Sequence, residues 1–246
     1  LSRGARYVLA SLMGVGLAFI YIPLTVVVIN SFNSSRTFSW PPSEFTTKWW
    51  AKALENTGVR EALRWSILAG LSATVIALLL GTALAFAVSR YQFFGRDTIS
   101  LLVVLPISLP GVVTGIALNN AFTKGAGMST GLLTVVIGHA TFCIVIVYNN
   151  AFARLKRMGS SLQEASMDLG ANGITTFRLI TLPNLASALF AGGLLAFGLS
   201  FDEIVVTTFT AGPGIQTLPI WIYNNLFRPN QAPIVNVVAA ILVIFS

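Results

Sequence analysis

Residues 65–89, WSILAGLSATVIALLLGTALAFAVS, decide the fold class because this stretch contains no charged residue. A transmembrane helix needs about 20 mostly apolar residues to cross a hydrocarbon core of about 30 Å. The chain as a whole, 246 residues long, has 55% hydrophobic and 9% charged residues and a mean hydropathy of +0.79. Soluble domains carry about 25% charged residues. The composition therefore excludes a water-soluble globule and indicates a multi-span membrane protein.

Similar uncharged windows recur along the chain and predict an all-α membrane protein with six transmembrane helices. We place these helices at 7–29, 65–89, 99–120, 131–151, 184–206 and 233–246. The last window is too short to cross a bilayer, so we expect the given chain to stop inside its sixth helix.

The window 204–227 is also uncharged, but its Gly212-Pro213-Gly214 segment breaks a helix. We expect a loop followed by a short interfacial helix that carries Trp221 and Tyr223, since these aromatic types settle at headgroup level. A seventh span is the alternative.

The predicted spans divide the chain into two parts. Residues 1–64 hold the first transmembrane helix and an outer loop, and residues 65–246 hold the core, with a cytoplasmic loop at 152–183. Basic residues are denser at the span ends that share a side with the N-terminus, which predicts a cytoplasmic N-terminus. In the outer loop, Lys48-Trp-Trp-Ala-Lys52 is expected to lie on the membrane surface, with tryptophans toward lipid and lysines toward water.

The loop between the fourth and fifth spans contains a predicted helix. Ser161-Leu-Gln-Glu164 has the spacing of a capping box, in which the two side chains bind the free amides of the first turn. A second short helix is expected from Ile174 to Thr181. Pro183 would then open the fifth span, at a first-turn position that tolerates proline.

This loop resembles the "EAA" signature of permease subunits of type I ABC importers. One departure is visible, because the third position of the signature is usually alanine and here it is Ser166. The residues that the resemblance assigns to ATPase coupling are Glu164, Ala165, Ser166, Asp168, Gly170, Leu182 and Pro183.

The resemblance implies a permease fold in a bacterial inner (plasma) membrane, with a coupling helix that docks on a cytoplasmic ATPase. The implied partners are a second homologous permease, two ATPase subunits, and a periplasmic or lipid-anchored substrate-binding protein.

The sequence also lacks the motifs of an enzyme. It has no Gly-Lys dipeptide, and hence no Walker A loop for phosphates, and it has no carboxylate–histidine cluster. One histidine and one cysteine cannot form a His/Cys metal site. The basic residues are scattered, which argues against nucleic acid. We therefore expect a transport subunit without its own cofactor, with ATP and Mg²⁺ bound by the partner ATPase.

Asp202 and Glu203 are acidic residues at the outer end of the fifth span. A carboxylate inside a membrane is costly unless it faces a cavity or a partner, so the pair is a candidate for the substrate path. A solvated pair among the headgroups is the alternative, and adjacent helical residues point about 100° apart, so only one is expected to line the path. Phe197 and Phe201 are candidates for cation–π contacts or plain packing.

Trp221 and Tyr223 are further candidates for residues that line the substrate path. His139 is expected to be satisfied by a neighbouring carbonyl or hydroxyl, with a protonation role as the alternative. Pro106 and Pro110 are expected to kink the third span.

The segments 200–203, 210–214 and 217–219 resemble the second permease subunit of bacterial spermidine/putrescine importers. This resemblance implies a polyamine substrate, a polycation that needs carboxylates to replace its lost water. The alternatives are an ABC permease for another small solute, such as 4-aminobutyrate, thiamine or an iron complex, and an ion-coupled secondary carrier. A membrane enzyme is a more distant alternative.

Overall fold

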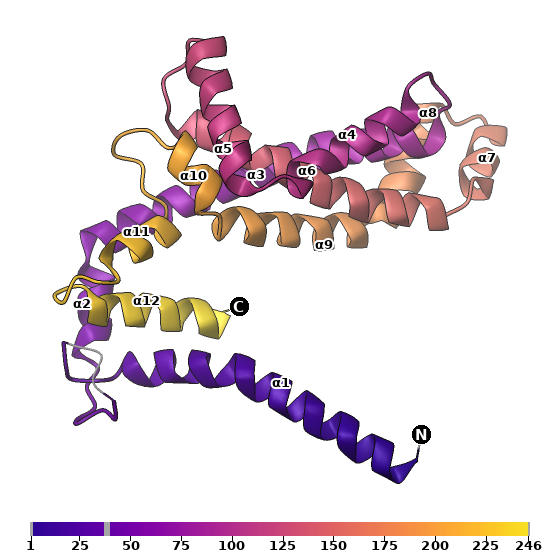
Figure 1. The fold of residues 1–246 in the computed structure, drawn as a ribbon. Helices are drawn as coiled ribbons and strands as arrows, with labels where there is room; N and C mark the ends of the chain where they lie inside the picture. Colours follow the sequence, from indigo (N-terminus) through magenta and orange to yellow (C-terminus); the bar gives the residue numbers. More distant parts are fainter. Residues whose placement is uncertain (1, 37–39, 246) are drawn as a thin grey trace. The chain divides into compact units, whose positions relative to one another are not determined.

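The computed structural model describes residues 2–36 and 40–245, and these residues are helical apart from loops and one isolated β-bridge between Asn33 and Phe45. Figure 1 traces the helices in order along the chain. They are α1 (Arg3–Asn30), α2 (Lys48–Glu55), α3 (Thr57–Arg90), α4 (Arg96–Ser108), α5 (Gly111–Asn120), the π-helix η1 (Ala121–Gly125), α6 (Leu132–Arg157), α7 (Ser161–Asp168), α8 (Gly173–Thr176), the π-helix η2 (Phe177–Thr181), α9 (Leu182–Phe201), α10 (Val205–Thr210), α11 (Leu218–Asn225) and α12 (Ala232–Phe245).

The prediction of an all-α, multi-span membrane protein is confirmed, although a count of six spans is not. Four helices are long and apolar enough to cross a membrane, and a fifth span results if α4 and α5 with η1 count as one. The apolar part of α12, Ala232–Ile244, is shorter. The chain forms two compact units, one of residues 1–62 and 220–246 and the other of residues 63–219.

The third predicted span is broken rather than kinked. Its two halves, Arg96–Ser108 and Gly111–Gly125, meet at an angle of 106°. Leu109 is extended, with φ −86° and ψ 145°, because a residue before proline is pushed out of the helical region. Pro110 then precedes the first turn of α5, where its missing N–H costs nothing.

The fifth span starts and ends earlier than predicted. Gly173–Phe201 is one continuous helical segment, so the short helix expected at 174–181 is the beginning of the span itself. The π-turn of η2 accommodates Pro183: the Leu182 N–H bonds to the Phe177 carbonyl five residues back, just before the proline that has no N–H. The segment ends at Phe201, so residues 202–206 are not part of it.

The window 204–227 contains two short helices, α10 and α11, separated by a loop that includes Gly214 with φ +82°. These helices have 6 and 8 residues, so neither is a seventh span. The predicted short helix with Trp221 and Tyr223 is α11.

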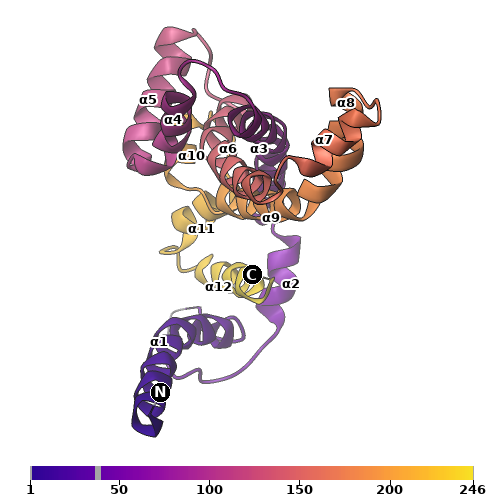
Figure 2. The same cartoon turned by 90° about the vertical axis from the view of Figure 1, so that its right-hand side faces the viewer.

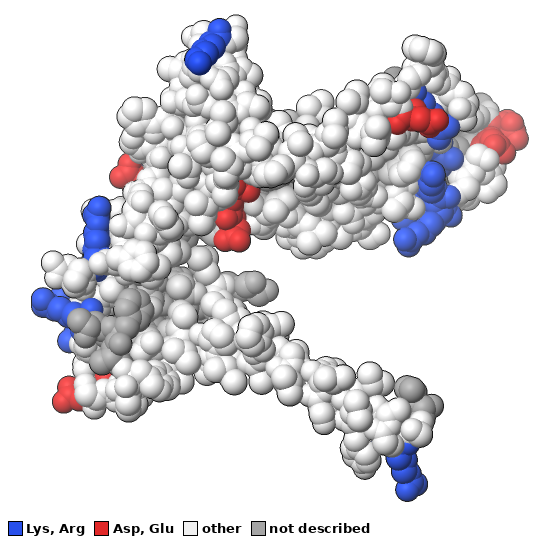
Figure 3. Space-filling view, viewed as in Figure 1, with Lys and Arg blue, Asp and Glu red and all other residues white. Residues whose placement is uncertain are grey.

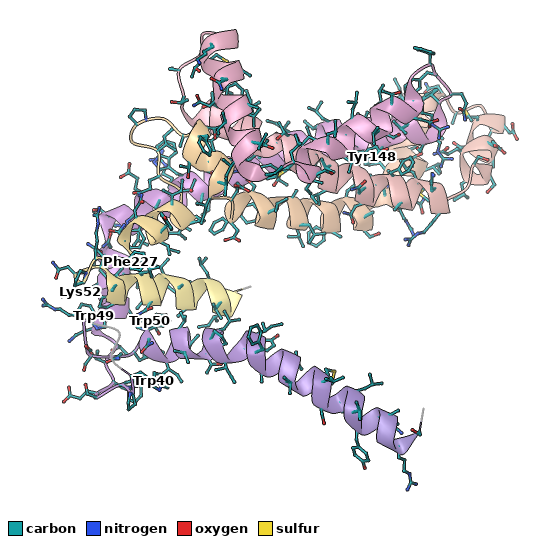
Figure 4. The ribbon with its side chains drawn as sticks, in the orientation of Figure 1. Trp40, Trp49, Trp50, Lys52, Tyr148 and Phe227 are labelled. Carbon is teal, nitrogen blue, oxygen red and sulfur yellow. The ribbon has the colours of Figure 1, made fainter. Side chains whose placement is uncertain are left out.

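In the unit of residues 1–62 and 220–246, α12 packs against α1 and α2 (Figure 1). The expected orientation of the outer-loop tryptophans is wrong for Trp49, which is 4% exposed. Its indole N–H donates to the Asn33 carbonyl at 2.9 Å, and Lys48 and Lys52 lie over its ring at 4.8 and 5.2 Å (Figure 4). A buried indole needs a hydrogen-bond acceptor, and the Asn33 carbonyl provides one inside the protein, so the ring of Trp49 points inward rather than toward lipid.

In the unit of residues 63–219, α6 packs against α4, α9 and α10 and carries the most buried face (Figure 2). Small residues of three helices form one core cluster, in which Ala73, Cys143 and Ala196 are fully or almost fully buried. Small side chains let the helices approach closely: a Cβ on Gly81 would lie 3.0 Å from the Ile144 carbonyl oxygen.

Candidate functional site

The first candidate site is the short helix α7, at the end of the unit where α6 ends and α8 begins (Figure 1). The predicted capping box is wrong, because the N-cap residue is Ser160 rather than Ser161 and no side chain caps the helix. The Ser160 carbonyl instead accepts the N–H groups of Gln163 and Glu164, both at 2.9 Å. Ser160 and Ser161 are both possible N-cap residues of α7, and the helix has Ser160 as its N-cap.

α7 ends in a Schellman motif centred on Gly170. The Gly170 N–H donates to the Met167 carbonyl at 2.9 Å, and the Ala171 N–H donates to the Ser166 carbonyl at 3.1 Å. Gly170 has φ +86°, a conformation that favours glycine. A Cβ there would meet nothing of this chain within 4 Å. Glycine is therefore explained here by backbone conformation rather than by a close contact within the chain.

Two side-chain hydrogen bonds fasten α7 to the helix that follows it. Ser166 Oγ lies 3.1 Å from Thr176 Oγ1, and Gln163 Nε2 donates to Thr181 Oγ1 at 2.8 Å. Thr176 and Thr181 are 5% and 0% exposed, so both bonds are anchored in the buried side of α8 and η2. Ser166 departs from the resembled pattern, and its hydroxyl is one of the two groups that bind α7 to the following helix.

The remaining residues of the predicted coupling set lie on two different segments. Glu164 and Asp168 are exposed on α7, and Figure 3 shows both acidic and basic side chains on the surface at this end of the unit. Leu182 and Pro183 are exposed too, but they lie on the continuous helix rather than on the loop helix. Thr181, which directly precedes Leu182 and ends η2, is fully buried.

A groove of about 1090 Å³ separates α7 and α8 from the end of α3. Arg90 lines it and donates to the Gly159 carbonyl at 3.0 Å, which ties the end of α3 to the residue before the N-cap of α7. The Phe86 and Phe177 rings meet edge to face at 5.2 Å between centroids in the same wall.

The exposed surface of this loop includes large apolar side chains, two of which, Met167 and Ile174, also line the groove. Large apolar side chains are exposed at 54%, 50%, 89% and 81% on Leu162, Met167, Leu169 and Ile174. An apolar patch rimmed by charges on a rigid helix is typical of a protein docking surface.

The second candidate site is the corner between α9 and α10, where Asp202 and Glu203 lie. Both residues follow the end of the span, so the expected 100° offset along a helix does not apply to them. Asp202 is the C-cap of α9 and is exposed. Glu203 is half-buried, and its Oε1 accepts the Val206 N–H at 2.8 Å. This carboxylate caps the start of α10, where negative charge is stabilised by the free amides.

His139 holds this corner together from α6. It is fully buried, with Nδ1 2.7 Å from Ser200 Oγ and Nε2 2.8 Å from Thr207 Oγ1. The Thr207 hydroxyl donates its only hydrogen to the Glu203 carbonyl at 2.8 Å, so it can only accept from the imidazole. A neutral His139 with its proton on Nε2, accepting from Ser200 at Nδ1, therefore satisfies every group. The hydroxyl partners agree with the expectation of a satisfied core histidine.

The candidate aromatic residues of the path lie in different surroundings. Phe197 packs over Gly70, where a Cβ would be 3.0 Å from its ring, and its centroid is 5.7 Å from that of Phe201. Trp221 is 5% exposed and Tyr223 is 65% exposed, and both belong to the unit of residues 1–62 and 220–246.

Several contributors to these sites were not predicted from the sequence. They include the anchors Thr176 and Thr181, and the pair Ser200 and Thr207 that flanks His139. Serine and threonine are common in apolar helices, where they usually bond to their own backbone. Only the spatial arrangement distinguishes these four from the others.

Comparison with known proteins agrees with this geometry. A family model described as "Binding-protein-dependent transport system inner membrane component" matches residues 77–246. The spermidine/putrescine transport system permease protein PotC of Escherichia coli (strain K12) is 35% identical over 230 residues, which cover 93% of this chain and 86% of that protein. The putrescine transport system permease protein PotI of the same organism is 33% identical over 234 residues, which cover 92% of this chain and 82% of that protein.

A solved structure has the same fold. It is the crystal structure of a bacterial ABC transporter involved in the import of the acidic polysaccharide alginate, with a TM-score of 0.74 and 18% identity. The match covers 99% of this chain and 93% of that chain.

Proposed function

Since this chain belongs to the family of binding-protein-dependent transport system inner membrane components, we propose that it forms the membrane path of an importer for a polyamine such as spermidine or putrescine. It is a multi-pass membrane protein and a transport subunit, not an enzyme. The observation that carries the choice of substrate is the likeness over most of the chain to two permeases named for polyamines.

The proposed assembly follows from the family. Permeases of this kind work with another permease, an ATPase and a substrate-binding protein. For this chain we assign a second homologous permease, two cytoplasmic ATPase subunits that bind ATP and Mg²⁺, and a periplasmic or lipid-anchored binding protein. The proposed location is the inner membrane of a bacterium.

The rigid fastening of α7 supports a role in coupling. Its apolar face is exposed, while its bonds to Thr176 and Thr181 join it to the continuous segment Gly173–Phe201. This segment has 29 residues and is therefore about 43 Å long. A push on α7 by a closing ATPase would move the far end of the segment as well, which lies next to Asp202.

The acidic corner supports the passage of a cation. Asp202 is exposed, and an exposed carboxylate at the end of a membrane helix replaces part of the hydration that an ammonium group loses. Glu203 instead accepts the Val206 N–H and caps the start of α10. We therefore assign Asp202 the direct contact with substrate, and Glu203 a role in shaping the corner.

Uptake measurements test this proposal. Proteoliposomes that contain the complete complex should accumulate radiolabelled putrescine or spermidine only when ATP is supplied with the binding protein. Unlabelled polyamine should compete, whereas 4-aminobutyrate, thiamine and ferric citrate should not. Competition by one of these solutes instead would reassign the substrate within the family. Accumulation driven by an ion gradient without ATP would favour an ion-coupled carrier.

A further inference from the structure

A polar groove lies between α6 and α9 on the unit of residues 63–219, apart from the groove beside α7 and from the acidic corner. Its volume is about 410 Å³. The residues that line it are Asn149, Asn150, Ala153, Arg154, Arg157, Ser187 and Ala188. Figure 3 shows Lys and Arg gathered at this end of the unit.

The groove is built on one face of α6. Asn150, Arg154 and Arg157 are spaced four and three residues apart, so they form a stripe along the helix. The stripe is fixed in place at its centre, where Arg154 Nε donates to the Asn184 carbonyl of α9 at 3.0 Å. This bond leaves the two terminal amino groups of the guanidinium for another partner. Ser187, one turn along α9 from Asn184, supplies a hydroxyl on the opposite wall.

The charge of the groove has one sign. Among the described residues that line it are two arginines and no carboxylate. The groove beside α7, in contrast, contains both Arg90 and Glu164. A groove of purely positive charge repels a polycation and attracts an anion.

The groove lies in the last turns of α6, one of the helices long and apolar enough to cross a membrane. α6 ends at Arg157, and Asn149 lies eight residues earlier, about 12 Å along the helix. Arg154, Arg157 and Asn149 are all exposed on the unit. Charged groups at such a position need polar partners, because bare hydrocarbon would leave their donors unsatisfied.

We propose that this groove binds the headgroup of an anionic phospholipid, with the phosphodiester between Arg154 and Arg157. A guanidinium presents paired N–H donors that fit two phosphate oxygens. The Asn149 amide and the Ser187 hydroxyl line the groove and can bind the ester and glycerol oxygens, whereas Asn150 Nδ2 already donates to the Ile146 carbonyl at 2.9 Å. Basic pockets between membrane helices on the cytoplasmic side take phospholipids of this kind. The proposal depends on the membrane position of α6 and not on the identity of the transported solute.

Lys156 provides a matched control for the test. It is the neighbour of Arg157 and also carries one positive charge, but its ammonium lies over the Phe152 ring at 4.7 Å and does not line the groove. Lys156→Gln and Arg157→Gln therefore remove the same charge from the same helical turn, and only the second removes it from the groove.

The experiment is a lipid titration of the purified complex in detergent, with bound lipids counted by native mass spectrometry. Phosphatidylglycerol should bind in preference to phosphatidylcholine of the same acyl chains. Arg157→Gln should weaken phosphatidylglycerol binding about fivefold, the effect expected for one basic residue near an anionic surface. Lys156→Gln should leave it within twofold of the wild type. Inorganic phosphate in millimolar excess should not displace the lipid, since it lacks the acyl chains.

Equal effects of Arg157→Gln and Lys156→Gln, displacement by phosphate, or no preference over phosphatidylcholine would each overturn the proposal. The last result is also expected if the second permease covers the groove in the complex. If Arg157→Gln does not assemble, Arg157→Lys and Ser187→Leu replace it. The lysine variant should keep the preference for phosphatidylglycerol, whereas the leucine variant, which narrows the groove and removes the hydroxyl without changing charge, should weaken it.

Discussion

The two candidate sites of the unit of residues 63–219 are stabilised in opposite ways. The helix α7 exposes its apolar face and is fastened by two polar bonds at its inner side. The corner after α9 exposes a charge, Asp202, and is fastened by a buried network around His139. The first arrangement agrees with the proposed docking of an ATPase, and the second with the proposed contact with a cation.

The two sites also differ in what fixes their geometry. At α7 the short-range geometry is set by backbone, through Gly170 and the Schellman bonds. At the corner the geometry is set by side chains, because His139 binds Ser200 and Thr207, which lie 61 and 68 residues further along the chain. Substitutions should therefore damage the first site through local conformation and the second through packing of three helices.

The largest effect is expected at Gly170. Gly170→Gln places a side chain on a residue with φ +86°, which costs about 1–2 kcal/mol and redirects the end of α7. ATP-driven uptake should fall tenfold or more while the protein still inserts, because the spans are untouched. Uptake and ATP hydrolysis by reconstituted complexes measure the uncoupling.

Gly173 is the matched control, because a Cβ there also meets nothing within 4 Å and no positive φ is found. Gly173→Gln should transport close to the wild-type rate, and Gly170→Asn should retain more uptake than Gly170→Gln, since asparagine tolerates this conformation better. Equal losses at both glycines would point to crowding of the ATPase surface instead. Normal uptake in Gly170→Gln would remove α7 from the mechanism.

The next effect concerns stability rather than coupling. His139→Ala leaves the buried Ser200 hydroxyl beside an empty space and without its partner, at a cost of about 1–3 kcal/mol, whereas the Thr207 hydroxyl keeps its bond to the Glu203 carbonyl. The thermal midpoint of the purified complex should fall by several degrees. His139→Gln, whose amide both donates and accepts, should recover part of the loss.

Thr141 on the same helix is the control for His139, because its hydroxyl bonds only to the Gly138 carbonyl one turn back. Thr141→Val should change the midpoint much less. An equal loss in the two variants would show that the network around His139 contributes nothing beyond ordinary helix packing.

The sequence predicted these two regions unequally, for a physical reason. The charge-free windows are local, so the helical class followed from them, and the position of α7 followed from equally local signals, the Ser161-Leu-Gln-Glu164 spacing and the resembled signature. The boundaries failed where tertiary structure decides: the π-turn at Pro183 extends the fifth span backward, and Asp202 ends it early. His139 was correctly expected to be satisfied, yet its partners could not be named, since Ser200 and Thr207 are distant in sequence.

A smaller effect is expected at Asp202. Asp202→Asn keeps the shape of an exposed cap and removes its charge, so the KM for polyamine uptake should rise by a factor of about five or less, as for a solvent-accessible ion pair of about 1 kcal/mol. Stability should be unchanged. Uptake kinetics over a range of spermidine concentrations measure the effect.

Glu203→Gln is the companion variant, because a glutamine oxygen can still accept the Val206 N–H. It should keep the corner and change KM less than Asp202→Asn. If both single variants and the double variant have the wild-type KM, the acidic corner does not contact the substrate. The polyamine proposal would then depend on the similarity to known permeases alone.

The smallest effect is expected at Ser166. Ser166→Ala restores the usual residue of the resembled signature and removes only the 3.1 Å contact with Thr176, worth about 0.5–1.5 kcal/mol. Because Gln163 still binds Thr181, α7 should remain fastened, and uptake should stay within twofold of the wild type.

Gln163→Ala alone should behave similarly, whereas the double variant should lose more than the sum of the two, because no polar bond then holds α7 against α8 and η2. Uptake by the three variants at equal expression measures this. If the losses of uptake are small and additive, the backbone at Gly170 alone positions α7. The difference between this site, fixed by its backbone, and the corner, fixed by side chains around His139, would then be larger.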